Sequence, residues 1–379
     1  MKYRTGVILA LLCAGMGCAA WWGSGCAAVS QPKAAVVAER EPPFVVPVVE
    51  LRGDGAELGQ AYGEKLSTPI HYLFDNYLKP YFRNEAQRFI ALTIAGTFEG
   101  KLEPQHAAEA EALAKQVNID PREVMLAQCF LDLSPMTACT TITLPADAAP
   151  DGVARFARNL DFPGMKVADK NTVVLIYHPN GRYAFAAVSW PGLLGVLSGM
   201  NEHGLTLANM EITRTGGLPK AMPYSMLYRT ILERCKTVDE AVALLEKTPR
   251  QTANNLMLMD EAGNRAVVEI TTEKIVVRRG EAGKALISTN HHRGLDQDTA
   301  GLCWRYDLLH KSAKGEFGRI GAKELEGMLG DVEQGKMTLQ SMVFEPSNRV
   351  MYLATGEEAP KGTFYRLNLK RYFEASSLR

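Results

Sequence analysis

Apolar residues recur at helical spacing through the part of the chain that follows residue 55. Residues 56–66, 70–82, 86–98 and 104–116 each carry apolar side chains three and four positions apart. Pro121, placed directly behind the N-cap candidate Asp120, predicts a further helix over 121–130. A short apolar run at 44–51 ahead of these helices predicts a strand. The pattern therefore predicts a helical N-terminal region over residues 48–138.

The pattern changes after residue 139 to short apolar runs separated by Gly, Pro and Asn. Residues 178–182, His-Pro-Asn-Gly-Arg, are typical of a tight hairpin turn, and 260–264 predict a second turn. Strands that enclose pairs of helices favour an α+β fold with helices covering antiparallel sheet. The expected strands are 140–144, 153–158, 172–177, 183–189, 193–200, 205–212, 255–259, 266–271, 274–278, 285–288, 341–345, 350–354 and 363–368, and the expected helices are 224–235, 238–246, 303–312 and 322–329.

The first 28 residues have the pattern of an export signal. Lys2 and Arg4 form a basic start, and an uncharged apolar run and small residues follow. Cys18 and Cys26 each stand between Gly and Ala-Ala, which makes them candidates for lipidation in a lipoprotein signal, although neither has Leu three positions upstream. A transmembrane anchor is the alternative. Residues 29–47 contain four prolines and predict a flexible tether.

Charge and cysteine content exclude several classes of protein. The chain has 379 residues, with 42 Lys and Arg against 42 Asp and Glu, and this balance argues against a nucleic-acid partner. Of the seven cysteines, three lie in the export signal, and the other four are too few for a disulfide scaffold. One or two disulfides remain possible, and an unpaired cysteine is a candidate nucleophile. Because no CxxC pair occurs, a zinc site of that kind has no support.

Cys139 lies where the helical pattern ends and the first of the later strands begins. Arg158 and Asp161 follow in the next predicted strand, three residues apart. An Arg beside a thiol lowers the thiol pKa, and an Asp can orient an amine or a guanidinium. Without further information, a buried core cysteine and an ordinary structural ion pair are the simpler interpretations.

These residues carry a family resemblance. Cys139-Thr140 followed by Arg158-Asn159-Leu160-Asp161 resembles the N-terminal-nucleophile (Ntn) hydrolases with a catalytic cysteine. The resemblance is narrower to the peptidase C45 family, which includes acyl-CoA:6-aminopenicillanate acyltransferase, and more distant to choloylglycine hydrolases and penicillin V acylases. It extends over residues 48–370 and includes the segments 51–63, 199–205, 254–263, 288–291 and 304–306.

The resemblance implies a four-layer αββα sandwich and a set of catalytic roles. The chain would cleave itself between Ala138 and Cys139, so that the new α-amine serves as base for the thiol. Arg158 would favour the thiolate, and Asp161 would bind the ammonium. Asn201 and Asn290 are the implied oxyanion donors, and Arg305 would support the site or bind a substrate carboxylate. Residues 48–138 would be the pro-segment or α chain, and residues 139–379 the catalytic region.

The expected substrate is a small N-acyl molecule, cleaved at a linear amide by hydrolysis or by acyl transfer through a thioester. Trp190, Phe162 and the leucines of residues 193–197 favour an apolar acyl group, although the same residues suit a core. No cofactor is expected. His203 and His291-His292 stand next to the candidate site segments, but adjacent His residues do not share one helix face, so no metal site is expected. Asn254 and Asn255 either orient the site or end a strand.

Two other classes compete with this interpretation. A Ser-His-Asp hydrolase has little support, because no G-x-S-x-G elbow occurs. A non-catalytic exported binding lipoprotein that keeps the fold needs only Cys139 to be a core residue. The oligomeric state is not predicted, and possible membrane anchoring depends on the N-terminal lipid.

Overall fold

The computed structural model describes residues 43–82, 84–133, 138–212, 220–295 and 303–374. The predicted export signal, including Cys18 and Cys26, and all of the predicted tether up to residue 42 lie outside the described residues. None of the helices in the described ranges is both long enough and apolar enough to cross a membrane.

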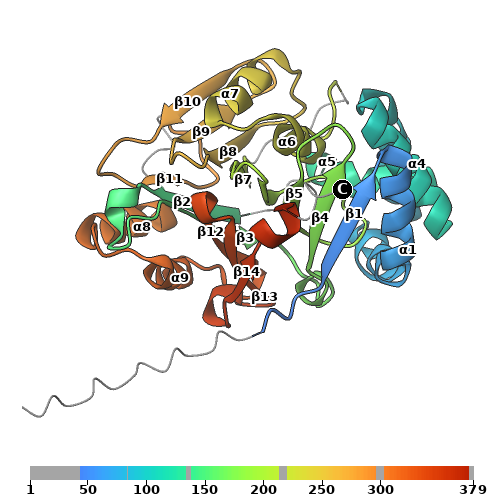
Figure 1. Ribbon diagram of the computed structural model, residues 1–379. Coiled ribbons are helices and arrows are strands. Elements are labelled where there is room, and N and C mark those ends of the chain that lie inside the picture. Colours follow the sequence, from blue (N-terminus) through green and yellow to red (C-terminus); the bar gives the residue numbers. More distant parts are fainter. Residues whose placement is uncertain (1–42, 83, 134–137, 213–219, 296–302, 375–379) are drawn as a thin grey trace, which may run out of the picture. The chain divides into compact units, whose positions relative to one another are not determined.

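One sheet has eight strands, and its first strand comes from the predicted N-terminal region. β1 runs parallel to β4, and each of the other neighbouring pairs is antiparallel. The helical N-terminal region is therefore joined by main-chain hydrogen bonds to the sheet of the region after residue 139 (Figure 1). In spatial order the strands are β1 (Val48–Gly53), β4 (Val173–Pro179), β5 (Phe185–Ser189), β6 (Ser198–Asn201), β7 (Thr206–Glu211), β8 (Asn254–Met259), β9 (Arg265–Ile270) and β10 (Ile275–Arg279).

The second sheet has six antiparallel strands and carries Cys139. β2 and β3 pair so that Ala138 lies opposite Asp161 and Cys139 opposite Leu160. Residues far apart in sequence are thus brought together at the end of this strand pair. In spatial order the strands are β11 (Leu286–Ser288), β2 (Ala138–Leu144), β3 (Arg155–Asp161), β12 (Thr338–Glu345), β13 (Val350–Thr355) and β14 (Tyr365–Asn368).

Helices cover the outer faces of both sheets. α6 and α7 pack on the eight-stranded sheet, α8 and α9 pack on the six-stranded sheet, and β2 faces β7 between them (Figure 1). The predicted α+β fold with αββα layers and an N-terminal helical region is confirmed. The helices are α1 (Gly55–Leu73), α2 (Lys79–Tyr81), α3 (Glu85–Gly96), α4 (Pro104–Val117), α5 (Pro121–Leu133), α6 (Tyr224–Arg234), α7 (Val238–Lys247), α8 (Trp304–Gly315), α9 (Ala322–Asp331) and α10 (Lys370–Glu374), with a π-helical turn η1 (Phe74–Leu78) after α1.

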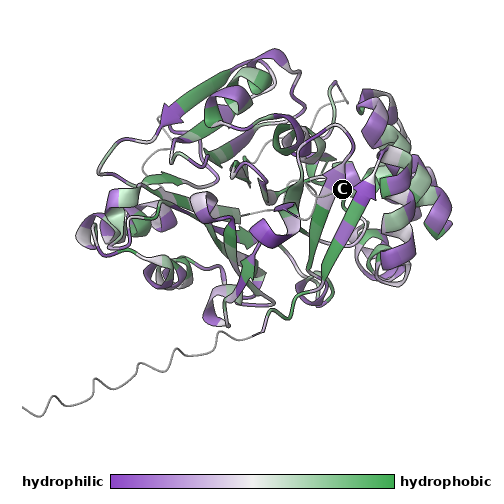
Figure 2. Cartoon of the chain, viewed as in Figure 1, coloured by the Kyte–Doolittle hydropathy of each residue, from purple (hydrophilic) through white to green (hydrophobic). Residues whose placement is uncertain are grey.

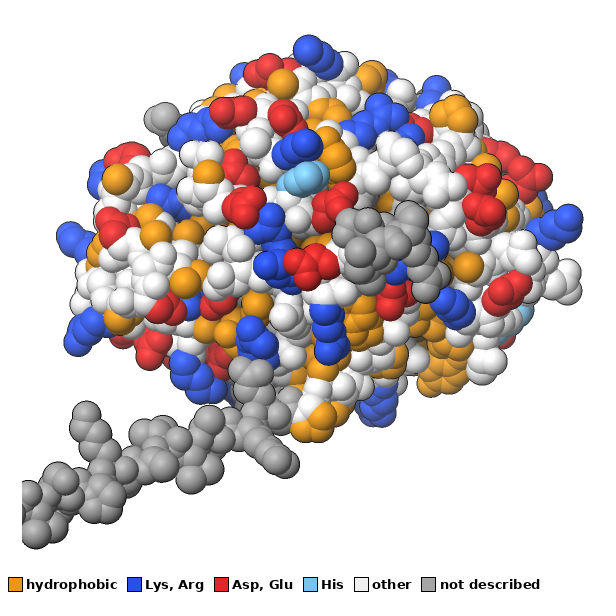
Figure 3. Space-filling view, viewed as in Figure 1, with side chains coloured by type: hydrophobic (Ala, Val, Ile, Leu, Met, Phe, Trp, Pro, Cys, Tyr) orange, Lys and Arg blue, Asp and Glu red, His pale blue; other side chains and the backbone are white. Residues whose placement is uncertain are grey.

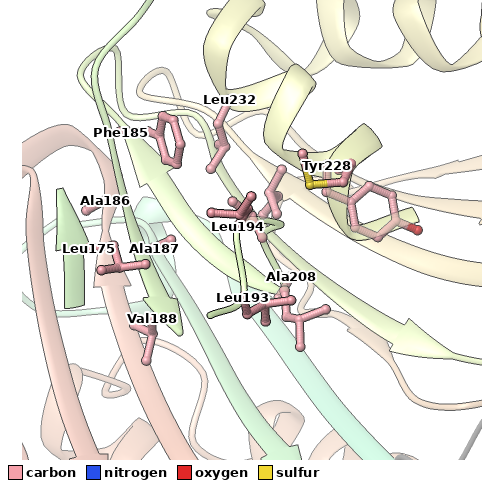
Figure 4. Packing of buried hydrophobic residues seen from close by; sticks show 14 of the residues in the cluster. Leu175, Phe185, Ala186, Ala187, Val188, Leu193, Leu194, Ala208, Tyr228 and Leu232 are labelled. Carbon is pink, nitrogen blue, oxygen red and sulfur yellow. The ribbon is translucent and has the colours of Figure 1, made fainter. Parts of the chain in front are cut away.

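Apolar side chains fill the spaces between these layers. Strands of both sheets are mostly hydrophobic, while the outer helices have a polar face (Figure 2). In the larger core, Phe185 of β5 lies beside Leu232 of α6 (Figure 4). A separate cluster of buried apolar side chains packs α8 and α9 against the six-stranded sheet. It includes Val343 and Leu329. On the surface, acidic and basic side chains are interspersed over the face that Figure 3 shows.

Glycines allow α1 and α4 to pack closely. A Cβ on Gly55 would lie 2.1 Å from the main-chain oxygen of Gln105, and one on Gly59 would lie 2.2 Å from that of Glu109. A side chain at either position would therefore push α4 away. Asp54 caps α1 by accepting a hydrogen bond from the Glu57 amide, and the Glu57 carboxylate accepts one from the Asp54 amide.

Several element boundaries differ from the sequence prediction, among them those of β6 and α1. The strand expected over 193–200 begins only at Ser198, and ahead of it the Leu194 carbonyl accepts a hydrogen bond from Arg229 and the Leu197 carbonyl one from Arg158. The helix expected at 56–66 and the start of the one expected at 70–82 are joined in α1, which continues through Pro69 to Leu73 with a non-helical Leu66 (φ −129°), and η1 and α2 follow it.

Candidate active site

Cys139 is the second residue of β2, and its side chain is buried. Nη2 of Arg158, on the neighbouring strand β3, lies 3.4 Å from the Cys139 Sγ. Nη1 of Arg158 donates to the Leu197 carbonyl and to Ser198 Oγ, at 2.6 Å in the second case. These bonds hold the guanidinium fully buried against the thiol, so the Arg158 charge is fixed beside the sulfur.

Burial raises the pKa of the Cys139 thiol, and the Arg158 charge opposes this effect without overcoming it. In the intact chain the thiol therefore remains protonated at neutral pH. A base within reach of the sulfur is needed to form the thiolate.

Asp161 ends β3 opposite Ala138, at the predicted cleavage site. Its Oδ1 accepts a hydrogen bond from Thr338 Oγ1, while Oδ2 has no hydrogen-bond partner in the part of the chain that the structure describes. Nη1 of Arg305 lies 3.6 Å from Oδ2. Burial raises the pKa of Asp161 to about 7, although Thr338, Arg305 and Arg158 lower it. The carboxyl can thus accept an ammonium group or hold a proton near neutral pH.

Asn290 and Arg305 contact the main chain of Cys139. The Cys139 amide nitrogen donates to Asn290 Oδ1 at 2.7 Å, and Nη1 of Arg305 donates to the Cys139 carbonyl at 2.7 Å. Nη2 of Arg305 also donates to Asn290 Oδ1, at 3.0 Å. Asn290 Nδ2 donates to the Glu211 carbonyl at 2.7 Å. In this arrangement the Asn290 side chain accepts from the Cys139 nitrogen and donates to the Glu211 carbonyl, and Arg305 contacts the Cys139 carbonyl.

The structure does not bring Asn201 to Cys139. Asn201 Nδ2 donates to the carbonyls of Leu232 and Cys235, at 2.9 and 2.7 Å, and Oδ1 accepts from the amides of His203 and Leu205. The two Nδ2 bonds tie the β6–β7 turn to the end of α6, and the two Oδ1 bonds close the turn itself. The expectation that Asn201 donates to the oxyanion does not fit this geometry, because both hydrogens of its amide group are used at the end of α6.

Asn209, eight residues later on β7, lies where that donor was expected. Its Oδ1 accepts from Arg158 Nη2 at 3.4 Å, and it lines the same cavity as Cys139. Since Oδ1 faces Arg158, Nδ2 is the amide group that can donate to a bound carbonyl. In the sequence, Leu207-Ala208-Asn209 lies in the strand that follows the Gly-Met-Asn turn containing Asn201.

An apolar cavity opens beside Cys139. Its empty volume is about 680 Å³, a figure that includes the solvent at its open mouth. Its lining includes Leu73, Tyr77 and Phe130 of the N-terminal region as well as Phe162 and Trp190 of the later region. The residues before Cys139 are therefore part of the cavity.

Aromatic residues fix the shape of this cavity. The Tyr77 hydroxyl donates to the Pro163 carbonyl and the Trp190 indole to the Ala168 carbonyl, each at 2.8 Å. Phe162 contacts the rings of Tyr77, Phe130 and Trp190, with centroids 6.0–6.2 Å apart. Because the polar atoms of Tyr77 and Trp190 are bound to main chain, the rings present apolar surface to a ligand.

The other candidates have structural positions. The His203 ring packs against Tyr183, with centroids 4.5 Å apart. Asn255 Nδ2 donates to the carbonyls of Thr289 and His291, and so holds the segment that carries Asn290. Within the described ranges no group of three or more His, Cys, Asp or Glu is arranged to hold a metal ion. Cys129, Cys139, Cys235 and Cys303 are buried free thiols.

Comparison with known proteins confirms the resemblance seen in the sequence. Residues 148–314 match the family described as acyl-coenzyme A:6-aminopenicillanic acid acyl-transferase. The match includes Arg158, Asp161, Asn209, Asn290 and Arg305, and it begins nine residues after Cys139.

Similar proteins match over parts of the chain. A rabbit (Oryctolagus cuniculus) N-acylethanolamine-hydrolyzing acid amidase is 28% identical over 159 residues, 40% of this chain and 43% of its own. Protein dcd1A of Dictyostelium discoideum is 24% identical over 233 residues, 53% of each chain. The chain thus spans about half the length of these curated relatives. Among solved structures, a Caenorhabditis elegans N-acylethanolamine-hydrolyzing acid amidase ortholog aligns with a TM-score of 0.46 at 18% identity, over 55% of this chain and 93% of its own.

Proposed function

From the premise that residues 148–314 match the acyl-coenzyme A:6-aminopenicillanic acid acyl-transferase family, we propose that this protein is a cysteine Ntn hydrolase. It cleaves itself before Cys139 and then hydrolyses, or transfers, the acyl group of a linear amide through a Cys139 thioester. The observation that carries the proposal is the environment of Cys139. Its sulfur, its nitrogen and its carbonyl are each held by a different side chain, Arg158, Asn290 and Arg305.

Self-cleavage begins with attack of the Cys139 Sγ on the Ala138 carbonyl carbon. The Ala138–Cys139 C–N bond breaks, a C–S bond forms, and the thiol proton ends on the released amine. Water then hydrolyses the thioester to the Ala138 carboxylate and the free thiol. Asp161 supports this step because it lies opposite Ala138 in the strand pair and its Oδ2 has no hydrogen-bond partner among the described residues. Asn290 Oδ1 is already bound to the Cys139 nitrogen.

The released α-amine then activates the thiol for turnover. An α-amine has a pKa of about 8, so at neutral pH a useful fraction is unprotonated and can take the thiol proton. Sγ attacks the substrate carbonyl, Asn209 Nδ2 donates to the oxyanion, and the α-ammonium returns its proton to the leaving amine. Water, or an acceptor amine, resolves the thioester.

The cavity supports an apolar acyl group. Apart from Cys139, Arg158, Asn209 and the Tyr224 hydroxyl, its lining side chains are hydrocarbon or aromatic. Burying each methylene of an acyl chain contributes about 0.8 kcal/mol. A medium or long alkyl chain is therefore bound more tightly than a short one. The rabbit relative is named for hydrolysis of N-acylethanolamines, and N-acyl amides of small amines are the class we propose here.

The basic start, the apolar run and the cysteines of the first 28 residues support export, with a lipid anchor on Cys18 or Cys26. Membrane association that globomycin abolishes, and that needs one of these cysteines, is the expected result in a bacterial host. Protein that stays in the cytosol with Met1 retained would contradict export.

A substrate screen tests the proposed reaction. Purified wild type and the Cys139→Ala variant would be incubated with N-dodecanoyl amides of small amines, N-acyl amino acids and β-lactams, and free acid would be quantified. We expect release from the dodecanoyl amides by wild type only. Equal release by both proteins, or none from any N-acyl compound by processed wild type, would contradict the proposal.

A further inference from the structure

Residues 190–197 connect β5 to β6 through a series of turns and bends, and we call them the wall segment. The first four residues of the wall segment line the cavity beside Cys139, and so does its last residue, Leu197. The Leu197 carbonyl also accepts from Arg158, whose guanidinium contacts the Cys139 sulfur. The wall segment therefore joins the surface of the cavity to the surroundings of the reacting thiol.

Gln128 of α5 binds the middle of the wall segment through both ends of its side-chain amide. Its Oε1 accepts from the main-chain nitrogens of Leu194 and Gly195, at 2.7 and 3.2 Å. Its Nε2 donates to the Gly192 carbonyl at 2.8 Å. The Gln128 side chain is buried. A buried segment outside the sheet ladders needs partners for its main-chain groups, and this one side chain supplies three of them.

Tyr62 of α1 binds the start of the wall segment. Its hydroxyl accepts from the Gly192 nitrogen at 3.0 Å and donates to the Trp190 carbonyl at 3.4 Å. Gly192 has a φ of +96°, and a Cβ there would lie 2.6 Å from Cε1 of Phe74. The wall segment thus packs directly on the N-terminal region, to which Tyr62, Phe74 and Gln128 all belong.

The end of the wall segment next to the thiol is held by the catalytic region itself. The Val196 nitrogen donates to the Ser225 carbonyl at 2.9 Å, and the Leu197 carbonyl accepts from the Asn209 nitrogen at 3.2 Å. Neither bond involves a side chain of the N-terminal region. Loss of the bonds from α1 and α5 would therefore release the cavity-lining half of the wall segment and leave the Arg158 contact in place.

We propose that Gln128 is a positioning residue, through which the N-terminal chain fixes the shape of the acyl-binding cavity after self-cleavage, and that Tyr62 assists it. This inference rests on the proposed function, which cuts the chain before Cys139 and places the acyl group in this cavity. The bonds from Gln128 to the wall segment then run from one chain to the other. Because they hold the wall segment ready for an acyl chain, Gln128 strengthens substrate binding and leaves the reactivity of the thiol unchanged.

Gln128→Met tests this role in processed protein, because Met has a similar length but cannot form the three hydrogen bonds. With N-dodecanoyl propylamine as substrate, we expect KM to rise about tenfold or more and kcat to stay within about threefold of wild type. The inhibition constant Ki of dodecanoic acid, the expected product, should rise in parallel, since it occupies the same cavity. The pH dependence of Cys139 alkylation should not shift, because the Arg158 contact is kept.

Gln251→Met is a matched control. Gln251 is also buried, and its Oε1 also accepts from two successive main-chain nitrogens, those of Lys220 and Ala221 at 2.7 and 3.0 Å. Neither of these residues lines the cavity. Gln251→Met should therefore lower the melting temperature, as Gln128→Met does, but leave KM and Ki unchanged. A rise in KM and Ki that is confined to Gln128→Met separates positioning of the cavity from a general loss of stability.

Tyr62→Phe is a second and milder test, since it removes only the hydroxyl that binds Gly192. It should raise KM and Ki about threefold, and it decides the question if Gln128→Met does not fold. Values of KM and Ki within about twofold of wild type in the folded variants overturn the inference alone. Equal changes of KM, kcat and the alkylation profile in Gln128→Met and Gln251→Met also overturn it. Absence of turnover by wild type overturns the proposed function on which it rests.

Discussion

The main-chain nitrogen of Cys139 lies 2.7 Å from Oδ1 of Asn290, although 151 residues separate the two in sequence. An amide oxygen that already accepts from this nitrogen in the intact chain remains an acceptor when the nitrogen becomes an amine. The site is thus arranged around the nitrogen as much as around the sulfur. This relationship suits the proposed self-cleavage, in which the Cys139 nitrogen becomes the free α-amine.

Asn209 and Asn201 form a matched pair, because both are buried asparagines on neighbouring strands and only one lines the cavity. Asn209→Ala should lower kcat by about 10²–10³ if its Nδ2 stabilises the oxyanion. Asn201→Ala should lower the melting temperature instead, since four hydrogen bonds are lost, and should leave the kcat of folded enzyme within a few-fold. The reverse pattern, measured by steady-state kinetics and thermal unfolding, would return the oxyanion role to Asn201.

The raised pKa of Asp161 predicts how stability depends on pH. The folded chain holds the Asp161 proton up to about pH 7, whereas the unfolded chain releases it near pH 4. Between these values the folded state binds more protons, so the free energy of unfolding falls as pH rises, by at most about 1.4 kcal/mol per pH unit from this group.

Urea unfolding of the Cys139→Ala chain from pH 4 to pH 8 measures this slope in a background that cannot be cleaved. Adding Asp161→Asn should flatten the profile in the same window, because an amide does not titrate. Identical profiles with and without the second substitution would show that Asp161 ionises normally in the folded chain.

Arg158 should control the thiol. Removing its charge leaves burial unopposed, so Arg158→Ala should raise the Cys139 pKa further and shift iodoacetamide alkylation to higher pH. Arg155→Ala is the control, because Arg155 lies on the same strand but pairs with Asp151 and Glu345 away from the sulfur. Both variants would be compared as folded, processed protein. If Arg158→Ala does not shift the pH dependence of Cys139 alkylation, then Arg158 has only a structural role.

Ala127 of α5 lines the cavity wall and can be used to shorten it. Ala127→Leu should lower kcat/KM for a long N-acyl chain by about tenfold or more relative to a short one, because it fills space the chain would occupy. Ala114→Leu on α4 is a matched control, equally confined but outside the lining. Comparing hexanoyl and dodecanoyl amides with both variants measures the ratio. If both variants change the ratio of kcat/KM for the two amides equally, the acyl chain does not bind in this cavity.

Most secondary structure could be predicted from the sequence, because the apolar spacing is regular in both the helical and the strand regions. The pairing of β1 with β4 could not, since a strand of six residues contains no information on its partner. The choice of Cys139, Arg158 and Asp161 depended on the family resemblance, because their order and spacing alone fit a core cysteine and a structural ion pair equally well; the pairing of β2 with β3 brings them close together.

The remaining site residues depend on where turns place them. Asn201 and Asn209 are both near a Gly-rich turn, and only the fold shows that Asn201 donates to the end of α6 while Asn209 faces Arg158. Thr338 was missed because β12 begins earlier than its apolar pattern, yet it binds the Asp161 carboxyl. The part of the cavity lining that comes from α1 and α5 could not be predicted from the sequence either, because its residues are typical of a hydrophobic core.

The measurement that tests the central claim most directly is the intact mass of purified protein under reducing conditions, combined with N-terminal sequencing. The account predicts two chains in wild type, the second beginning Cys-Thr-Thr-Ile at Cys139, and one uncut, inactive chain in Cys139→Ala. Amidase activity should rise in step with the appearance of the second chain. A wild-type protein that hydrolyses amides as a single uncut chain would contradict the claim that the freed amine of Cys139 is the base.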